Sequence, residues 1–344
     1  MKKTLLALAA LTAFAGVASA QSSVTLFGIV DLSINNVKNG NLSQKLLSSN
    51  QLNSNRLGFR GVEDLGGGMR AGFWLEGAMS NDDGTGTATG GGQNWQRRST
   101  VSLMGGFGEV RLGRDYTPSF WNKTIFDPLG TNGMGSSLNL ASTLGSGATT
   151  LVRANNTVGY FLPAMGGIYG QVQVAAGENT PGNKYMGARV GYAGGPVNVA
   201  VAFGKTYKDG PMLTDFKDFN VGGSYNLGFM TLIAQYNKVD YSTRDQKIAM
   251  VGVTVPFGAS TLKASYLTAK GAQGTSATDF DSKQIALGYQ YDLSKRTAIY
   301  ATVSSLDNDG SAATGSRFTV GQGPAMTIGS ATSRGYNLGV RHSF

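Results

Sequence analysis

The sequence predicts an all-β protein: a transmembrane, up-and-down antiparallel β-barrel of about sixteen strands, with one connection folded into its interior. Three observations support this prediction. Short segments alternate apolar and polar residues along most of the chain, which is the period of a strand with one apolar face. Tight turns alternate with longer polar connections, as in a meander with turns at one end and loops at the other. After Val17, no apolar run is long enough for a membrane-spanning helix.

The chain begins with the features of a secretory signal peptide. Two lysines precede an apolar run, and the small residues at 18–20 suit cleavage before Gln21. We therefore expect a cleaved signal peptide at residues 1–20 and a transmembrane barrel domain at residues 21–344. Cleavage removes two lysines and no acid, so the net charge falls from +9 to +7 (29 − 2 = 27 basic and 20 acidic residues).

The first expected strand shows the alternation most clearly. At residues 24–34 the even positions are apolar and nearly all large, whereas the odd positions are mixed and include Asp31. Segments 56–61, 69–78 and 109–113 repeat the pattern with charged residues on the second face. The later expected strands are individually weaker but regular, and they lie at 96–103, 158–162, 168–174, 188–192, 197–203, 219–225, 230–236, 251–255, 262–266 and 285–291.

Two segments near the C-terminus complete the set of expected strands. Residues 297–303 form a strand, but their composition leaves open which of its faces is apolar. The last strand, at residues 335–344, is expected to pair with the first, because unpaired strand edges are not tolerated in lipid. The barrel therefore closes through its two ends.

The polar faces of these strands favour a water-filled barrel in a membrane over a soluble barrel or sandwich. A soluble barrel with so many strands would be too wide for its side chains to fill. Aromatic residues beside the short turns suit a girdle at the membrane interface. Charged side chains recur on the less apolar faces, and five of them are expected to line the lumen: Arg60, Arg70, Arg111, Asp115 and Arg189.

The longest internal connection covers residues 117–152. It contains three aromatic residues, two prolines and five glycines, and it is too apolar for a disordered segment. Connections of this length are uncommon and generally functional. We expect this segment to fold into the lumen and to narrow it.

Composition argues against several functional classes. The chain has no cysteine, which removes disulfides, thiol catalysis and cysteine-based metal sites. Its one histidine, His342, lies on the apolar face of the last expected strand, so a histidine-dependent catalytic or metal site is not expected, and neither is a cofactor site. Nucleic acid is not an expected partner, because the basic residues are spread over the strands and form no single patch.

Seven segments, in order along the chain, resemble the trimeric sixteen-stranded general porins of Gram-negative beta-proteobacteria. They are SSVTLFGIVDLSI after residue 21, NRLGFRGVEDLGGG at 55–68, GFGEVRLGRDYTP at 106–118, RANNTVGYF at 153–161, VPFG at 255–258, YDLSKRTAIYA at 291–301 and GVRHSF at the end. The resemblance implies that residues 117–152 form the constriction loop of an outer-membrane channel. It also implies homotrimers packed through their barrel walls, and insertion into outer-membrane lipid by barrel-assembly machinery that reads a C-terminal aromatic residue, here Phe344.

The same resemblance implies the residues of the pore constriction. Arg56 and Arg153 match two members of an arginine cluster on the wall, and Glu76 matches a wall carboxylate. The third basic position stays open between two neighbours. Alignment on the following GGFG favours Arg97, whereas the alternation of the strand favours Arg98.

Asp127 is the acidic residue that the loop contributes to the constriction under this resemblance. The function it implies is passive diffusion of small hydrophilic solutes and ions, with a preference for anions. One unit charge acts on another about 6 Å away in water with only about 0.7 kcal/mol, so several arginines together supply about 1.4 kcal/mol, roughly a tenfold preference.

Three alternatives remain at this stage. A substrate-specific outer-membrane channel would use Phe120, Trp121 and Phe126 as a stacking track for sugars. A surface adhesin or phage receptor would present the long connection at residues 307–331. An outer-membrane barrel enzyme would need a nucleophile with a nearby base, for which His342 is badly placed.

Overall fold

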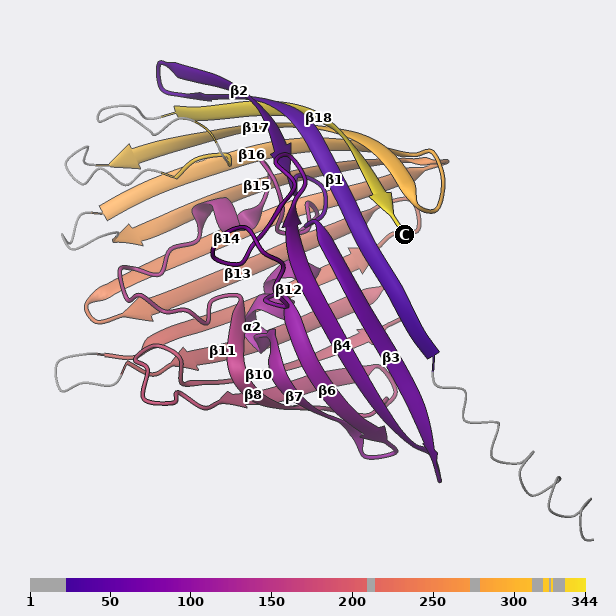
Figure 1. Cartoon of the computed structure of the whole chain (residues 1–344). Helices are drawn as coiled ribbons and strands as arrows, with labels where there is room; N and C mark the ends of the chain where they lie inside the picture. The colour runs from indigo at the N-terminus through magenta and orange to yellow at the C-terminus, as the bar shows by residue number, and fades with distance from the viewer. Residues whose placement is uncertain (1–22, 209–213, 273–278, 311–317, 322, 324–331) are drawn as a thin grey trace, which may run out of the picture.

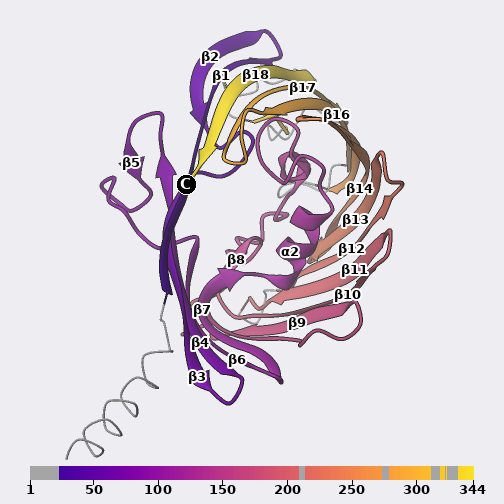
Figure 2. The ribbon, with the colours of Figure 1, turned by 90° about the vertical axis from the view of Figure 1, so that its right-hand side faces the viewer.

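The computed structural model describes residues 23–208, 214–272, 279–310, 318–321, 323 and 332–344. The expected signal peptide lies outside them. The described chain forms one antiparallel sheet that closes on itself as a barrel (Figures 1 and 2). Its strands are β1 (Ser23–Asn39), β2 (Leu42–Ser49), β3 (Arg56–Gly66), β4 (Met69–Ser80), β5 (Thr85–Gly86), β6 (Arg98–Gly105), β7 (Gly108–Tyr116), β8 (Arg153–Phe161), β9 (Ile168–Ala175), β10 (Tyr185–Gly194), β11 (Val197–Thr206), β12 (Phe216–Asn226), β13 (Thr231–Tyr241), β14 (Arg244–Phe257), β15 (Ser260–Ala272), β16 (Asp279–Asp292), β17 (Thr297–Gly310) and β18 (Thr332–Ser343).

The barrel wall has sixteen strands, as the sequence predicts. Eighteen strands are assigned, and two of them, β2 and β5, are short additions outside the ring, which leaves 18 − 2 = 16. Closure runs through β1, whose segment from Ile29 to Asn39 pairs with β18 and whose start pairs with β3. The expected pairing of the first and last strands is therefore confirmed. A closed ring leaves no unpaired edge facing lipid.

The two faces of the wall have opposite character. Along β1, the outward-facing Ile34 is 68% exposed, whereas the inward-facing Asp31 is completely buried. Apolar residues outside and polar residues inside are the arrangement of a barrel whose outer solvent is lipid. Strand β17, whose apolar face the sequence left undecided, follows the same rule. Ile299 and Val303 face outward, and Tyr300 faces inward, where its hydroxyl donates to Asp31. No helix among the residues that the structure describes is long and apolar enough to cross a bilayer.

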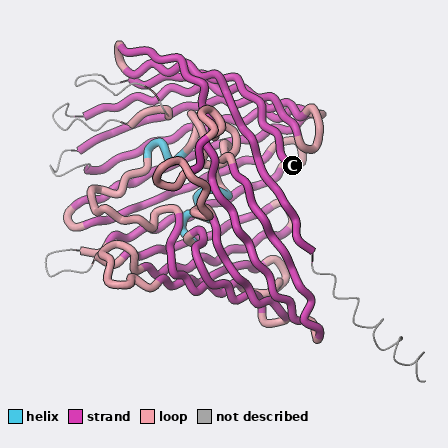
Figure 3. The backbone as a smooth tube through the Cα atoms, in the orientation of Figure 1, coloured by secondary structure: helices cyan, strands magenta, loops and turns pink. Residues whose placement is uncertain are grey.

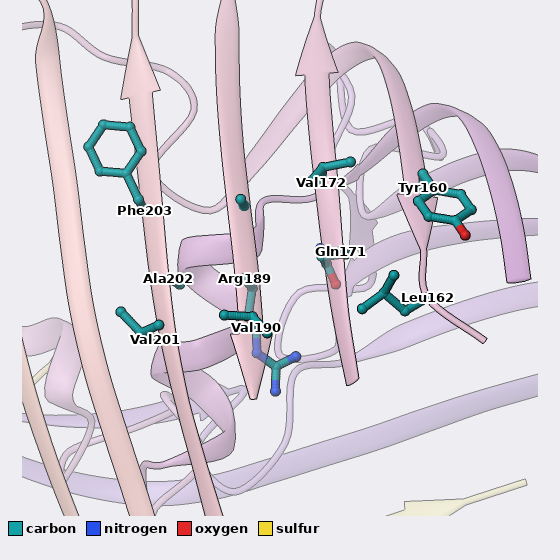
Figure 4. Close-up of a pocket in the computed structure, with 10 residues that line it drawn as sticks. Tyr160, Leu162, Gln171, Val172, Arg189, Val190, Val201, Ala202 and Phe203 are labelled. Carbon is teal, nitrogen blue, oxygen red and sulfur yellow. The ribbon is translucent and has the colours of Figure 1, made fainter. Parts of the chain in front are cut away.

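Figure 4 shows this outer face on strands β8 to β11. Val172, Val190, Val201 and Phe203 are exposed on neighbouring strands and border a shallow recess of about 300 Å³. Arg189, between Ala188 and Val190 in the sequence, belongs to the opposite face of the same strand and bonds to a residue inside the barrel. The alternation therefore gives lipid an apolar surface and leaves the charge to the interior.

The long connection between β7 and β8 folds into the ring (Figures 2 and 3). It begins with helix α2 (Pro118–Ile125) and continues through the 3₁₀ turn η2 (Ser137–Leu140). The hydroxyl of Thr117 accepts a hydrogen bond from the Phe120 amide, and proline at the first helical position suits this start. The apolar content of the loop is explained by its packing, because Met134 and Leu140 join inward-facing residues of the wall in one buried cluster.

Polar contacts attach the loop to one side of the barrel. The Lys123 ammonium lies 2.6 Å from the Asp218 carboxylate on β12, and both residues are buried. Asn122 donates to Asn220 on the same strand at 2.8 Å, and Gln235 on β13 donates to the Lys123 carbonyl at 2.9 Å. The loop therefore lies along the inner face from β10 onward and also reaches the chain just before β3, where the Ser54 hydroxyl donates to Asn132 at 2.7 Å. Strands β3 and β4 lie on the side of the ring away from α2 (Figure 2).

Candidate functional site

Three arginines gather on the side of the lumen that the loop leaves open. Arg56 opens β3, Arg153 opens β8, and Arg97 directly precedes β6, so all three lie where a wall strand meets its loop. Arg97 Nε lies 2.6 Å from Glu76 Oε1, and Arg56 Nη1 lies 3.3 Å from the same oxygen. Arg153 Nε donates to the Arg97 carbonyl at 2.8 Å. We call Arg56, Arg97 and Arg153 the arginine cluster.

Tyr116 joins this cluster to the loop. Its hydroxyl accepts a hydrogen bond from Arg97 Nη2 at 2.8 Å and one from Arg153 Nη2 at 2.7 Å, and the Arg153 guanidinium lies 4.3 Å from the centre of its ring. The ring stacks on Phe120 of α2 at 5.1 Å and meets Trp121 edge-on. One side chain thus fixes two guanidiniums relative to the helix that enters the lumen.

The choice between Arg97 and Arg98 has a geometric answer: both side chains are on the inner side. The ladder between β4 and β6 ends at the pair Glu76 and Arg98, with Arg98 inward. Arg97 lies beyond that last pair, so strand alternation does not constrain it, and it turns inward to Glu76. The two residues have different surroundings, since Arg98 lies 3.6 Å from Asp115 and over the ring of Trp74.

Glu76 is the carboxylate around which the arginine cluster forms. It is 3% exposed, and its second oxygen accepts a hydrogen bond from Trp74 Nε1 at 3.0 Å. Its partners are Arg56 and Arg97. Three guanidiniums and one carboxylate leave a local charge of +2 (3 − 1). The site therefore carries a net positive charge.

Asp127 requires a correction. It was expected to add a negative charge to the constriction, but the residue is 6% exposed and its oxygens accept hydrogen bonds from the amides of Leu129 and Ser137. Burial raises the pKa of the Asp127 carboxyl, which further weakens it as a fixed charge. Its position holds two turns of the loop together. The resemblance placed Asp127 at the constriction, and the sequence does not reveal its backbone partners.

Asp115 is placed differently from expectation in one respect. It lies on the inner side, as expected, but it is 1% exposed and does not meet the open lumen. Its carboxylate lies 2.6 Å from Arg111 Nη1 and also binds the amide of Tyr116. Asp115 therefore orients two arginines and the root of the loop.

The other expected lumen residues are arranged along the inner wall. Arg60 lies over the rings of Phe27 and Trp74. Arg111 binds Glu109 as well as Asp115, and its guanidinium lies 4.0 Å from the Phe161 ring centre.

Arg70 and Arg189 differ from this pair. Arg70 is exposed and lies one residue into β4, close to the turn. Arg189 Nε donates to Asn122 of α2 at 3.1 Å and therefore supports the loop. The last residue, Phe344, pairs through its backbone with Gly28 at the turn end of the barrel.

Tyr116 and Trp74 are the members of this region that sequence reasoning missed. Trp74 alternates in phase with Arg70 and Glu76, but its contacts with Arg60 and Arg98 come from neighbouring strands and leave no local pattern. Tyr116 follows a register shift between Gly113 and Asp115, where strict alternation stops being informative. Its position immediately before a Thr-Pro helix start was the available signal.

Comparison with known proteins agrees with this geometry. A family model described as Gram-negative porin matches residues 7–311, so the chain belongs to the Gram-negative porin family. It is 36% identical to outer membrane porin protein 32 of Delftia acidovorans over the whole of both chains. It is 30% identical to an outer membrane porin protein of Bordetella pertussis, over 90% of this chain and 95% of that one.

Solved structures give the same result. The anion-selective porin from Comamonas acidovorans superposes with a TM-score of 0.80 at 33% identity, covering 94% of this chain and all of that one. OmpT of Vibrio cholerae superposes with a TM-score of 0.67 at 16% identity, with 94% and 98% coverage, and shows the shared fold alone. The chain is an integral outer-membrane porin, and its barrel is a water-filled channel.

Proposed function

We propose that this porin passes small hydrophilic solutes and ions by diffusion and prefers anions, with the arginine cluster and Glu76 at the narrowest part. The observation that carries the proposal is the gathering of three guanidiniums around one carboxylate, on the wall opposite the inward-folded loop. Their net charge of +2 supports a roughly tenfold preference for anions in water. The relative from Comamonas acidovorans is named an anion-selective porin, which supports the same conclusion.

The test is the zero-current potential of the purified protein in a planar bilayer under a KCl gradient. Replacing both Arg56 and Arg153 by Glu changes the cluster from +2 to −2 and should reverse the sign of the potential. The matched control replaces Lys247 and Lys283 by Glu, which makes the same change in total charge. Both lysines are about half exposed at the loop end of the barrel. An unchanged potential in the cluster variant, or an equal shift in the control, would reject the assignment.

We infer that diffusion is general and not directed to one sugar. Phe120 and Phe126 are buried in contacts within the loop and against the wall, and Phe120 stacks on Tyr116, so these rings support the loop's position. The adhesin alternative rests on residues 307–331, most of which lie outside the described residues. The enzyme alternative depends on His342. Its ring is hydrogen-bonded to the Thr297 hydroxyl at an exposed strand end, which supports a channel without catalysis.

We infer further that residues 1–20 are removed on export, that Phe344 marks the chain for barrel assembly, and that three barrels pack as a homotrimer. The exposed apolar outer wall supports such packing, and a Vibrio cholerae OmpT structure with the same fold is described as a trimer form. Chemical cross-linking in detergent should give trimers and no larger species. The mature wild-type chain should start at Gln21. A variant lacking Phe344 should give fewer assembled trimers. Monomers under all conditions would contradict the inference.

A further inference from the structure

A second group of cationic side chains lies on the inner wall, between the arginine cluster and the end of the barrel that carries the short turns. Strands β1, β3, β4, β6 and β7 form a recess there of about 370 Å³. Its inward-facing lining includes Arg60, Trp74, Arg98, Ser102, Glu109 and Arg111. The recess adjoins the arginine cluster through Trp74 but contains none of the cluster's arginines.

Trp74 organises two guanidiniums in this recess. Arg98, from β6, lies 4.5 Å from the centre of the indole ring, and Arg60, from β3, lies 5.1 Å from it. Arg60 also lies 5.4 Å from the ring of Phe27. A guanidinium that lies over an aromatic ring keeps its N–H groups at its edge, where they form a fork that fits two oxygens on one centre. The rings therefore hold both forks in place before any ligand arrives.

The charges in the recess are unequally satisfied. Arg111 is bound by both Glu109 and Asp115, at 2.9 Å and 2.6 Å. Arg98 has Asp115 at the longer distance of 3.6 Å, and Asp115 is already engaged by Arg111. Among the residues that the structure describes, Arg60 has no carboxylate at ion-pair distance, and it is exposed. The free positive charge of the recess is therefore concentrated on Arg60, with a smaller contribution from Arg98.

We propose that this recess is a second binding station, which binds oxyanions. Arg60 is its main binding residue, and the rings of Trp74 and Phe27 hold the Arg60 guanidinium in place. The shared chemistry is a pair of oxygens on one centre, as in a carboxylate or a phosphate. A halide of the same charge has a single acceptor atom, so it cannot form the two parallel N–H···O bonds of a fork-to-fork contact. The station therefore discriminates between anions that the arginine cluster attracts by charge alone. This inference rests on the proposed passage of anions through the pore.

The experiment measures the block of single-channel chloride current by added acetate and, separately, by inorganic phosphate, at constant ionic strength. Wild-type protein should show block by one or both oxyanions, and the stronger of the two identifies which oxygen geometry fits. In Arg60→Gln the half-blocking concentration should rise about tenfold, as expected for loss of one charge-assisted bidentate contact. Arg60→Lys keeps the charge but loses the fork, so its half-blocking concentration should rise as well.

Arg70→Gln is the matched control. It removes the same charge from the inner side of the barrel, near the same turns, from an arginine outside the recess lining. Its half-blocking concentration should stay at the wild-type value. An equal rise in Arg70→Gln, no rise in Arg60→Gln, or no block of wild-type protein by either oxyanion would overturn the station. Cation selectivity of wild-type protein in KCl would instead overturn the proposed function, so the two failures are distinguishable.

Discussion

Glu76 makes the close approach of three arginines feasible. Like charges at this distance repel, and each guanidinium also loses part of its hydration beside the wall. A single buried carboxylate at 2.6 Å from Arg97 and 3.3 Å from Arg56 offsets much of this repulsion. Its hydrogen bond from Trp74 fixes the carboxylate in turn. The site therefore keeps a positive charge and a defined geometry at the same time.

Tyr116 is the neutral counterpart of Glu76 in this arrangement. Tyr116→Phe keeps the ring stack with Phe120 but removes the oxygen that accepts from Arg97 and Arg153. Because Arg97 is buried, its unsatisfied N–H should cost about 1–3 kcal/mol. We expect a lower thermal unfolding midpoint in detergent. We also expect a roughly two- to threefold weaker anion preference, because one contact that orients the arginine cluster is lost.

The control for this variant is Tyr160→Phe. That tyrosine also has its hydroxyl in a hydrogen bond, donated to the Phe107 carbonyl at a turn, and it lies at the opposite end of β8 from Arg153 of the arginine cluster. It should leave the zero-current potential at the wild-type value. If Tyr116→Phe and Tyr160→Phe have the same potential, then Tyr116 does not orient the cluster.

At the scale of elements, the loop depends on a buried ion pair. Lys123 on α2 and Asp218 on β12 are 2.6 Å apart and almost fully enclosed. Lys123→Met leaves a buried carboxylate without its partner, which should cost about 3–5 kcal/mol and loosen the helix. We expect a lower thermal unfolding midpoint, noisier open-channel current, and faster proteolytic cleavage within residues 117–152.

Two further variants sharpen this test. Lys238→Met breaks an ion pair of similar length, 2.8 Å, whose members are more than a third exposed, and it should cost about 0–1 kcal/mol. Adding Asp218→Leu to Lys123→Met removes the stranded charge and should recover part of the stability. If Lys123→Met unfolds at the same temperature as Lys238→Met, the buried pair does not hold the loop.

The wall was more predictable than the features attached to it. Alternation located the strands because each has one face in lipid and one in water. It did not reveal β2 (Leu42–Ser49), because this strand pairs with the extended end of β1 and has no apolar face in the barrel. Alternation also left Arg97 undecided, since it lies one residue beyond the end of its ladder. Asp127 was misplaced because its partners are backbone amides.

At the scale of the whole molecule, the ring is divided between two tasks. The strands from β10 onward hold the loop through buried polar and apolar contacts, and on β1 the loop-side end at Val37 joins the same apolar cluster. The strands from β1 to β8 carry the arginine cluster and the recess below it. Since both halves belong to one closed hydrogen-bonded sheet, the loop and the arginines keep a fixed separation. The width and the charge of the pore are therefore set by different residues and can be varied separately.

This separation predicts how selectivity depends on salt. The screening length is about 10 Å at 0.1 M and about 3 Å at 1 M, so the field of the arginine cluster reaches across a lumen of this kind only in dilute salt. We expect the anion preference, from zero-current potentials at a fixed concentration ratio, to fall steadily as the mean KCl concentration rises. The variant with Arg56 and Arg153 replaced by Glu should start from the opposite sign and converge on the same limit. A preference independent of salt would mean that ions are discriminated by direct contact at the wall, because a contact between desolvated groups is screened far less than a field acting through water.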